Sequence, residues 1–291
     1  MNLPARDALY WSVFVLLLLP LAAVLAVLIS FLMPFIPLDM RPIAELPAAS
    51  WWLFGKAPFP SFPTHPLWGL TAAIAVLCVA LITSLRVRVL YQRIRAPELF
   101  FFLIFLFSLS TETLRGGIAV LYVLDQSVSA GIVLTRTVYW GRFLGQLALL
   151  VAGLYALDMK YRNVLALTGA VLLIAFAIAS NLPLDRTVLL SSLVYKLGDE
   201  QSIRFVTIIL AILTMGCGAG AFFARKNPAF LRLSAAFLLL VAGREVSFAG
   251  TGPLILCMGL AAFLGGIPLF LSAIQGIYEE GGAARTGDAA G

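Results

Sequence analysis

The sequence has few charged residues. Asp, Glu, Lys and Arg make up 12% of its 291 residues, whereas hydrophobic residues make up 62% and the mean hydropathy is +1.01. An ordinary soluble domain carries about 25% charged residues. The deficit therefore excludes an ordinary soluble enzyme or DNA-binding domain and predicts a polytopic membrane protein, in which apolar segments and short connections occupy most of the chain.

Histidine and cysteine are scarce. His65 is the only histidine, and Cys78, Cys217 and Cys257 lie in apolar segments without a CxxC spacing. Zinc centres and Ser-His triads need histidine, and thiol exchange needs paired cysteines. We therefore expect no metal, no cofactor and no catalytic residues of these kinds, and we interpret the cysteines as small buried apolar residues.

Apolar runs of membrane-spanning length are abundant. A helix needs about 20 mostly apolar residues to cross a bilayer. The first run is longer than a signal-peptide core and lacks a convincing cleavage site, so we expect an uncleaved span. We predict an all-α, polytopic integral membrane protein in which residues 1–279 form one transmembrane domain and residues 280–291 a disordered cytoplasmic tail. The eight predicted transmembrane helices are about 10–35, 67–90, 97–124, 131–157, 164–181, 202–223, 228–248 and 254–278.

Two connections between the predicted spans are longer than the short turns elsewhere in the chain. The outer loop 36–66 is rich in proline, which interrupts helices, and in tryptophan, which favours the membrane interface. We expect this loop to carry one short interfacial helix at Pro47–Phe54. The apolar piece Val188–Tyr195 is too short to cross about 30 Å of hydrocarbon, so a second interfacial helix is expected there.

The distribution of basic residues predicts the orientation. Eleven basic residues lie on the side of the termini and four on the opposite side, and positive residues favour the cytoplasm. Both termini are therefore expected to be cytoplasmic, in a cytoplasmic (inner) membrane, and the net charge of +6 needs no nucleic-acid partner. The first group is Arg6, Arg86, Arg88, Arg93, Arg95, Lys160, Arg162, Arg225, Lys226, Arg232 and Arg285, and the second is Arg41, Lys56, Arg186 and Lys196.

The layout also indicates parallel helical-hairpin repeats. Spans two and three, four and five, and six and seven recur at a spacing of about 65 residues. Polar residues lie at similar positions on the returning helices, namely Glu112, Ser180 with Asn181, and Arg244 with Glu245. Parallel repeats with a site between them occur in transporters.

Ionisable residues inside the predicted spans mark the candidate site, because placing charge in hydrocarbon is costly. All the charges concerned lie in the outer half of the membrane or near its middle, so one cavity could hold them. The candidate ligand-binding residues are Glu112 and Arg115 on the third span, Arg136, Tyr139 and Arg142 on the fourth, and Arg244 and Glu245 on the seventh.

Two interpretations of these charges fit the sequence. Four arginines against two glutamates would give a shared, outward-facing cavity a charge of +2, and arginine matches carboxylate and phosphate. An anionic small molecule or a lipid headgroup is then the expected ligand. Alternatively, Glu112 pairs with Arg244 and Glu245 with Arg142 as interhelical ties, while Arg115 and Arg136 reach the outer headgroups.

Three functions follow from these interpretations. The leading hypothesis is a membrane-embedded ligand-binding module, a transporter or sensor, in which Glu112 or Glu245 would couple transport to protons. The second is a structural or assembly subunit that docks partner membrane subunits through Trp51 and Trp52. The third, an enzyme acting on a lipid-linked substrate with Glu112 as general base, lacks histidine and metal ligands to support it. Membrane lipids are expected partners in every case.

Overall fold

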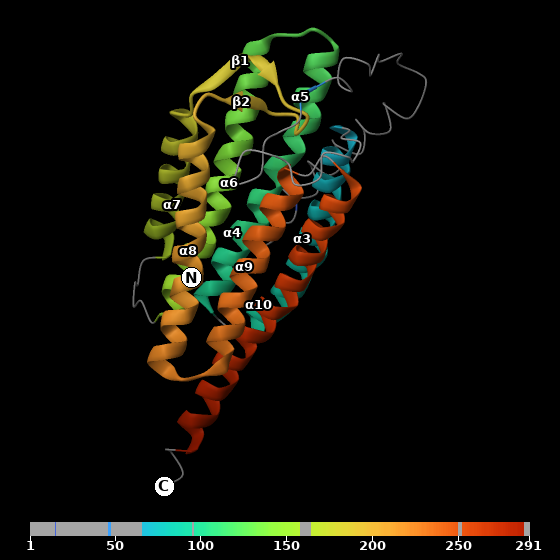
Figure 1. Ribbon diagram of the computed structural model, residues 1–291. Helices are drawn as coiled ribbons and strands as arrows, with labels where there is room; N and C mark the ends of the chain where they lie inside the picture. Colours follow the sequence, from blue (N-terminus) through green and yellow to red (C-terminus); the bar gives the residue numbers. More distant parts are fainter. Residues whose placement is uncertain are drawn as a thin grey trace.

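The computed structural model describes residues 15, 46–47, 66–94, 96–157, 164–249 and 252–287. In this part of the chain the protein is a helical bundle with a β-hairpin at one end (Figure 1). A 3₁₀ segment, η1, interrupts one of the long helices. The elements are α3 (Pro66–Arg93), α4 (Pro97–Ser108), η1 (Leu109–Thr113), α5 (Leu114–Val123), α6 (Val128–Ala156), α7 (Val164–Ser180), β1 (Leu184–Leu189), β2 (Tyr195–Leu197), α8 (Glu200–Arg225), α9 (Pro228–Ala249) and α10 (Pro253–Gly287).

Five of the described helices are long and apolar enough to cross a membrane: Trp68–Gln92, Pro97–Val123, Val128–Ala156, Glu200–Arg225 and Pro253–Tyr278. The apolar helix α7 is shorter, and α9 carries ionisable residues. The prediction of a helical membrane protein is therefore confirmed at this level. Eight spans, cytoplasmic termini and hairpin repeats stay predictions. The predicted first span and the interfacial helix Pro47–Phe54 lie outside the described residues, apart from Val15 and Pro47.

The segment Pro97–Val123, made of α4, η1 and α5, lies at the centre of the bundle. In its apolar 18-residue stretch, 83% is buried inside the protein, whereas 22% of the corresponding stretch of α8 is buried. Proline at the first position of α4 suits the start of a helix, and the run PELFFFLIFLFS supplies a broad apolar surface. Phe102 stacks on Phe270 of α10 with ring centroids 4.2 Å apart. The central helix is therefore held by aromatic packing below its 3₁₀ segment.

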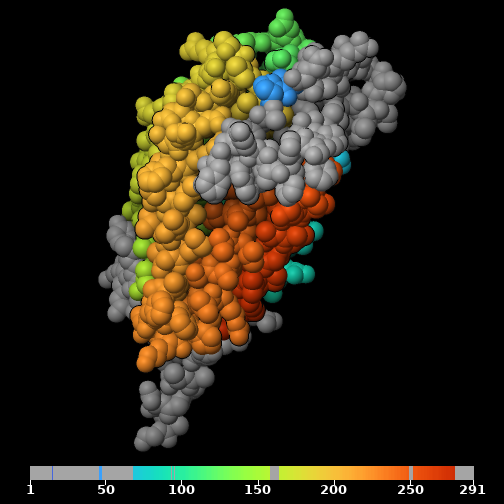
Figure 2. All heavy atoms as spheres, in the orientation of Figure 1, coloured from blue at the N-terminus to red at the C-terminus, as the bar shows by residue number. Residues whose placement is uncertain are grey.

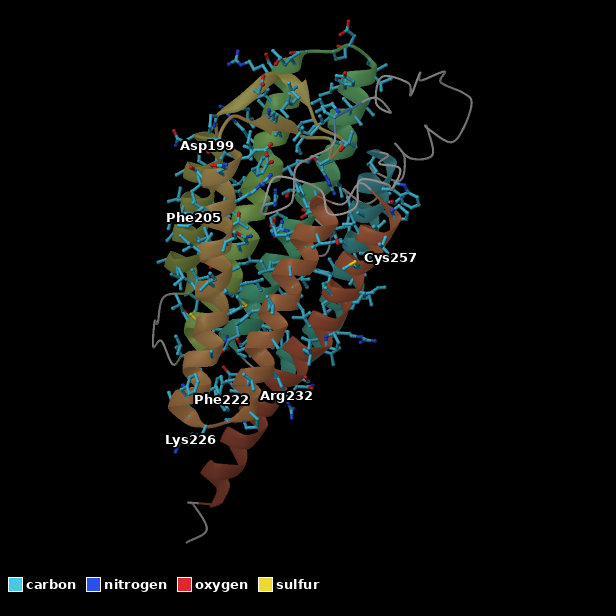
Figure 3. The ribbon with its side chains drawn as sticks, viewed as in Figure 1. Asp199, Phe205, Phe222, Lys226, Arg232 and Cys257 are labelled. Atoms are coloured by element: carbon cyan, nitrogen blue, oxygen red, sulfur yellow. The ribbon has the colours of Figure 1, made fainter. Side chains whose placement is uncertain are left out.

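Helices α8 and α9 form the outer face seen in Figure 2, with α10 beside them. The exposed side chains of α8 are mainly large and apolar, as expected where the solvent is lipid. Phe205 and Phe223 are 64% and 77% exposed, and Phe205 is marked in Figure 3. Helix α8 therefore exposes the apolar surface expected of a lipid-facing helix.

The contact between α9 and α10 depends on glycine. A Cβ atom on Gly243 would lie 2.5 Å from the backbone nitrogen of Phe263, and one on Gly259 would lie 2.7 Å from that of Ser247. Small residues allow helix backbones to approach closely in membranes. This contact sets the position of α9, which carries two of the candidate site residues.

The predicted interfacial helix at Val188–Tyr195 is wrong. Strands β1 and β2 pair antiparallel there, with Leu184 opposite Leu197 and Leu189 opposite Tyr195. A short apolar run does not by itself distinguish helix from strand, and β-branched residues such as Thr187 favour strand. The backbone N–H of Tyr195 donates to the hydroxyl of Thr135 on α6 at 3.3 Å. The hairpin is therefore docked on the end of the bundle.

Helix α8 begins with a side-chain cap, and helix α10 extends beyond its last apolar turn. Helix α8 starts at Asp199, whose carboxylate accepts a hydrogen bond from the backbone N–H of Ser202 at 3.1 Å. Hydrogen bonds from the hydroxyl and the N–H of Ser202 hold the pKa of the Asp199 carboxyl below its ordinary value. Helix α10 continues to Gly287, and the disordered cytoplasmic tail expected at residues 280–291 stays a prediction. Glu279, Glu280 and Ala283 are good helix formers that continue the last apolar turn.

Candidate functional site

The central span changes from α-helix to 3₁₀ helix over Leu109–Thr113. A 3₁₀ stretch inside a helix often marks a functional position, and its hydrogen bonds are less favourable than those of an α-helix. Serine and threonine hydroxyls support the backbone here by donating to the carbonyl three residues earlier. These bonds are Ser108 to Phe105 at 2.6 Å, Ser110 to Phe107 at 2.8 Å, Thr111 to Ser108 at 2.8 Å and Thr113 to Ser110 at 2.6 Å.

Arg115 is buried completely at the start of α5. Its Nε donates to the carbonyl of Glu112 at 3.2 Å, and its Nη2 donates to the carbonyl of Gly69 on α3 at 3.0 Å. Its Nη1 donates to the carbonyls of Phe248 on α9 at 3.0 Å and of Ser192 in the hairpin turn at 3.5 Å. One guanidinium group thus joins four parts of the fold. The expectation that Arg115 reaches the outer headgroups is wrong.

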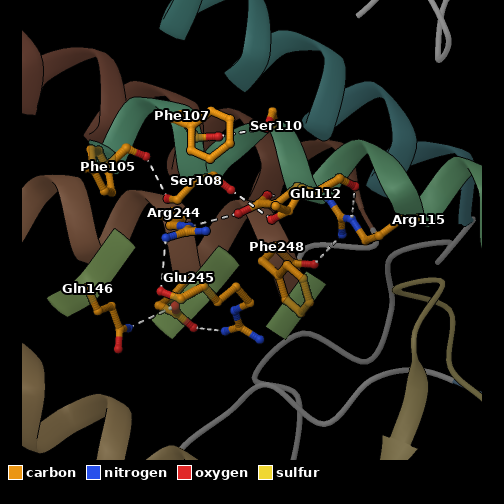
Figure 4. A network of polar contacts seen from close by, with 12 residues as sticks. Phe105, Phe107, Ser108, Ser110, Glu112, Arg115, Gln146, Arg244, Glu245 and Phe248 are labelled. Carbon is orange, nitrogen blue, oxygen red and sulfur yellow. Dashed lines mark hydrogen bonds and ion pairs between the residues drawn. The ribbon is translucent and has the colours of Figure 1, made fainter. Parts of the chain in front are cut away.

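Glu112 and Arg244 form a buried ion pair between η1 and α9. Nε of Arg244 donates to Oε1 of Glu112 at 2.8 Å, and the two side chains are 1% and 2% exposed. Nη1 of Arg244 donates to the backbone carbonyl of Arg142 at 3.2 Å. Oε2 of Glu112 also lies 3.8 Å from Nη2 of Arg115, so this carboxylate serves two arginines (Figure 4).

A second ion pair joins Arg142 of α6 to Glu245 of α9. Nη2 of Arg142 contacts Oε2 of Glu245, and Nε2 of Gln146 donates to Oε1 of the same carboxylate at 3.2 Å (Figure 4). The side chains of Arg142 and Glu245 are 15% and 26% exposed. This pair is therefore the accessible end of an otherwise buried group.

The ring of Phe248 lies against two of the arginines. Its centroid is 3.7 Å from Cζ of Arg142 and 4.8 Å from Cζ of Arg115. An aromatic face attracts a guanidinium group, more strongly where both are removed from water. Phe248 therefore holds Arg142 by its ring and Arg115 by both its ring and its carbonyl.

Five of the predicted site residues come together, and we call them the charge network: Glu112, Arg115, Arg142, Arg244 and Glu245. The predicted Tyr139 is buried beside them, with its ring centroid 5.3 Å from Cζ of Arg142. Arg136 is exposed on α6, and the structure shows no contact between its side chain and the network within the described residues. The expected cavity charge of +2 included Arg136, so the network itself is less positive.

Several contributors were not among the predicted site residues. Gln146 follows Arg142 by four residues and Phe248 follows Glu245 by three, so each lies on the same helix face as a charged residue. This spacing is the sequence feature that could have identified them. The backbone carbonyls of Gly69 and Ser192 had no signal in the sequence, because any residue type supplies a carbonyl. They become ligands of Arg115 only through the approach of α3 and the hairpin.

The network carries one more positive charge than negative, since three arginines face two glutamates. Two buried polar atoms, Nη2 of Arg244 in the network and Oε1 of the neighbouring Gln146, have no hydrogen-bond partner within the described residues. An unsatisfied buried polar group costs about 1–3 kcal/mol. Among the described residues no group of three or more His, Cys, Asp and Glu could hold a metal ion.

Gly145 provides a direct test of the packing beneath Arg244. A Cβ atom there would collide with Nη1 of Arg244 and the hydroxyl of Ser108. We expect Gly145→Ala to lower the free energy of unfolding by about 1–3 kcal/mol, the usual cost of overpacking. Thermal unfolding in detergent measures this. Gly216→Ala is the matched control, because a Cβ on Gly216 of α8 meets nothing within 4 Å. Equal melting temperatures for the two variants would contradict the expected packing.

Comparison of the chain with protein-family models, with curated proteins and with solved structures finds no match.

Proposed function

We propose that this chain is a membrane-embedded binding module for a small anion, acting in transport or sensing, and that the charge network is its binding site. The observation that carries the proposal is the unbalanced charge of the network, three arginines against two glutamates, on α9 and two helices of membrane-spanning length, Pro97–Val123 and Val128–Ala156. A charge without a counterion is costly inside a membrane. One bound anion would balance it.

The chemistry of the arginines supports the same proposal. Arginine keeps its charge at any physiological pH, and its planar fork donates two parallel hydrogen bonds to a carboxylate or phosphate. The side chain of Arg244 is 1% exposed, and its Nη2 has no hydrogen-bond partner among the described residues. An arginine held in this way is ready to donate to a further acceptor.

The accessible end of the network indicates where the anion enters. Arg142 and Glu245 are partly exposed, whereas Glu112, Arg115 and Arg244 are not. In a transporter, proton uptake by Glu245 would release Arg142 for the anion. Glu112 is a poorer candidate for that role because two arginines hold it.

We further propose that the hairpin end of the bundle faces the outside of a cytoplasmic membrane, with eight spans and both termini in the cytoplasm. Figure 3 shows Asp199 at one end of α8 and Lys226 at the other, near Arg232 of α9. Basic residues favour the cytoplasmic side. The charge network lies closer to the hairpin, since Arg115 bonds to the hairpin turn at Ser192.

The test is anion binding by the purified full-length protein. Isothermal titration calorimetry with chloride, acetate and phosphate, and co-sedimentation with phosphatidylglycerol vesicles, separate small anions from lipid headgroups. We expect Arg142→Gln to weaken binding about tenfold or more, because a hydrogen bond to a charged group contributes about 1.5–3 kcal/mol. Arg232→Gln is the control, since it removes the same charge from an exposed position on α9.

If the wild-type protein binds none of these anions, or if Arg142→Gln binds them as well as Arg232→Gln does, the anion-binding proposal is wrong. The pairs Glu112–Arg244 and Arg142–Glu245 would then act as packing ties, as a structural or assembly subunit requires.

A further inference from the structure

The carboxylate of Glu245 is held like a bound ligand. Both of its oxygens are engaged, Oε2 by Nη2 of Arg142 and Oε1 by Nε2 of Gln146 at 3.2 Å. Both donors come from α6, four residues and so about one helical turn apart, whereas Glu245 comes from α9. We call Arg142 and Gln146 the cradle. Two N–H donors from one rigid helix form a recognition element for a carboxylate.

The surroundings of the cradle restrict what else could bind there. The ring of Phe248 covers Arg142 at 3.7 Å, and the ring of Tyr139 lies 5.3 Å from the same guanidinium. Gln146 and Tyr139 are 3% and 5% exposed. The cradle therefore offers two polar donors beside two aromatic rings, which suits a small anion with an apolar group and disfavours a strongly hydrated one.

The group that now occupies the cradle restricts the ligand further. Glu245 presents one carboxylate with a single negative charge, so a monocarboxylate that takes its place leaves the charge at the cradle unchanged. A divalent anion carries a second charge that is more costly to remove from water. Monovalent anions are favoured over sulfate or doubly ionised phosphate.

From these contacts we infer that the cradle of Arg142 and Gln146 is the binding site of a small monocarboxylate, and that Glu245 occupies it in the unliganded protein as a tethered competitor. The inference rests on the proposed function and names its ligand class. Binding exchanges one carboxylate for another on the same two donors. The side chain of Glu245 is 26% exposed and can turn toward water when it is displaced.

The experiment compares acetate with sulfate on the full-length protein in detergent, at equal ionic strength. Removing the competitor in Glu245→Ala is expected to tighten acetate binding about tenfold or more relative to the wild type, as measured by calorimetry. In the wild-type protein, sulfate affinity is expected to be at least tenfold weaker than acetate affinity. Asp185→Ala removes a partly exposed carboxylate from strand β1 of the hairpin and should bind acetate as the wild type does.

Two additional variants keep the test decisive if Glu245→Ala folds poorly. Glu245→Gln keeps the side-chain shape, removes the charge of the competitor and should also bind acetate more tightly than the wild type. Gln146→Leu in the Glu245→Gln background removes one cradle donor and should weaken acetate binding about tenfold. Acetate should raise the melting temperature of Glu245→Gln by more than it raises that of the wild type.

Each contrary result has a separate meaning. If Glu245→Ala and Glu245→Gln bind acetate no more tightly than the wild type, Glu245 is not a competitor and the inference is wrong. If sulfate binds as tightly as acetate, the monocarboxylate class is wrong. In both cases loss of anion binding in Arg142→Gln would leave the proposed function standing, whereas absence of binding for every anion would overturn both.

Discussion

Replacing Arg115 with leucine is expected to lower the free energy of unfolding by about 2–5 kcal/mol. The side chain is fully buried and donates to four backbone carbonyls, those of Gly69, Glu112, Ser192 and Phe248. The bonds to Gly69 and Phe248 join separate helices, where polar contacts average about 0.6 kcal/mol each. A hydrogen bond to a charged group contributes about 1.5–3 kcal/mol, and this sets the lower limit. Leaving the carbonyls unsatisfied adds about 1–3 kcal/mol for each one that finds no water.

The measurement is unfolding of the purified protein in detergent, with Arg136→Leu as the control. Arg136 is exposed, and substitutions at such positions usually change stability by less than about 0.5 kcal/mol. Arg115→Lys should lose most of the same stability, because a single ammonium group cannot reach four carbonyls in the geometry of the guanidinium fork. Equal unfolding of Arg115→Leu and Arg136→Leu would show that Arg115 does not join these elements.

Removing the carboxylate of Glu112 is expected to be the second large effect. Glu112→Gln leaves Arg244 without its buried partner and Arg115 without its nearest carboxylate. Breaking a buried ion pair by removing one partner costs about 3–5 kcal/mol, because the remaining charge is uncompensated. Thermal or denaturant unfolding of Glu112→Gln in detergent should show this loss.

A double-mutant cycle separates the ion pair from general damage. Arg244→Gln combined with Glu112→Gln should recover part of the loss, giving a coupling energy of about 1–3 kcal/mol. The pair Glu200–Arg204, at 2.9 Å on α8, is the comparison, because its side chains are 22% and 26% exposed. Such partly exposed pairs, four residues apart on one helix, couple by about 0.3–0.5 kcal/mol. Similar coupling in the two cycles would contradict a dominant role for burial.

Much of the helical layout could be predicted because it depends on local features. Proline at Pro97 and Pro228 starts helices α4 and α9 at the expected positions, since proline suits the first helical turn. Apolar runs of sufficient length then predict long helices, whatever they pack against. The hairpin could not be predicted, because a mostly apolar segment of eight residues, Val188–Tyr195, fits either a strand or a short helix, and its docking on Thr135 is a tertiary contact.

The candidate site was predictable in its charged members and not in its arrangement. Glu112, Arg142, Arg244 and Glu245 are conspicuous because charge is rare in apolar segments. The pairing of Glu112 with Arg244 and of Arg142 with Glu245 was one of two interpretations, and both pairs are present. Helical periodicity gives the side of a helix on which a residue lies, but not which neighbouring helix faces that side.

The sequence by itself determined that this is a helical membrane protein with costly charges in a few of its helices, because length, hydropathy and charge are properties of each segment alone. The tertiary structure decided what those charges do. Close glycine contacts position α9 against α10, and the 3₁₀ turn at Leu109–Thr113 lies beside α9, so that Glu112 pairs with Arg244. The tertiary structure also leaves Arg136 outside the network and joins Arg115 to four carbonyls. These outcomes depend on distances between segments far apart in the chain, which no local pattern encodes.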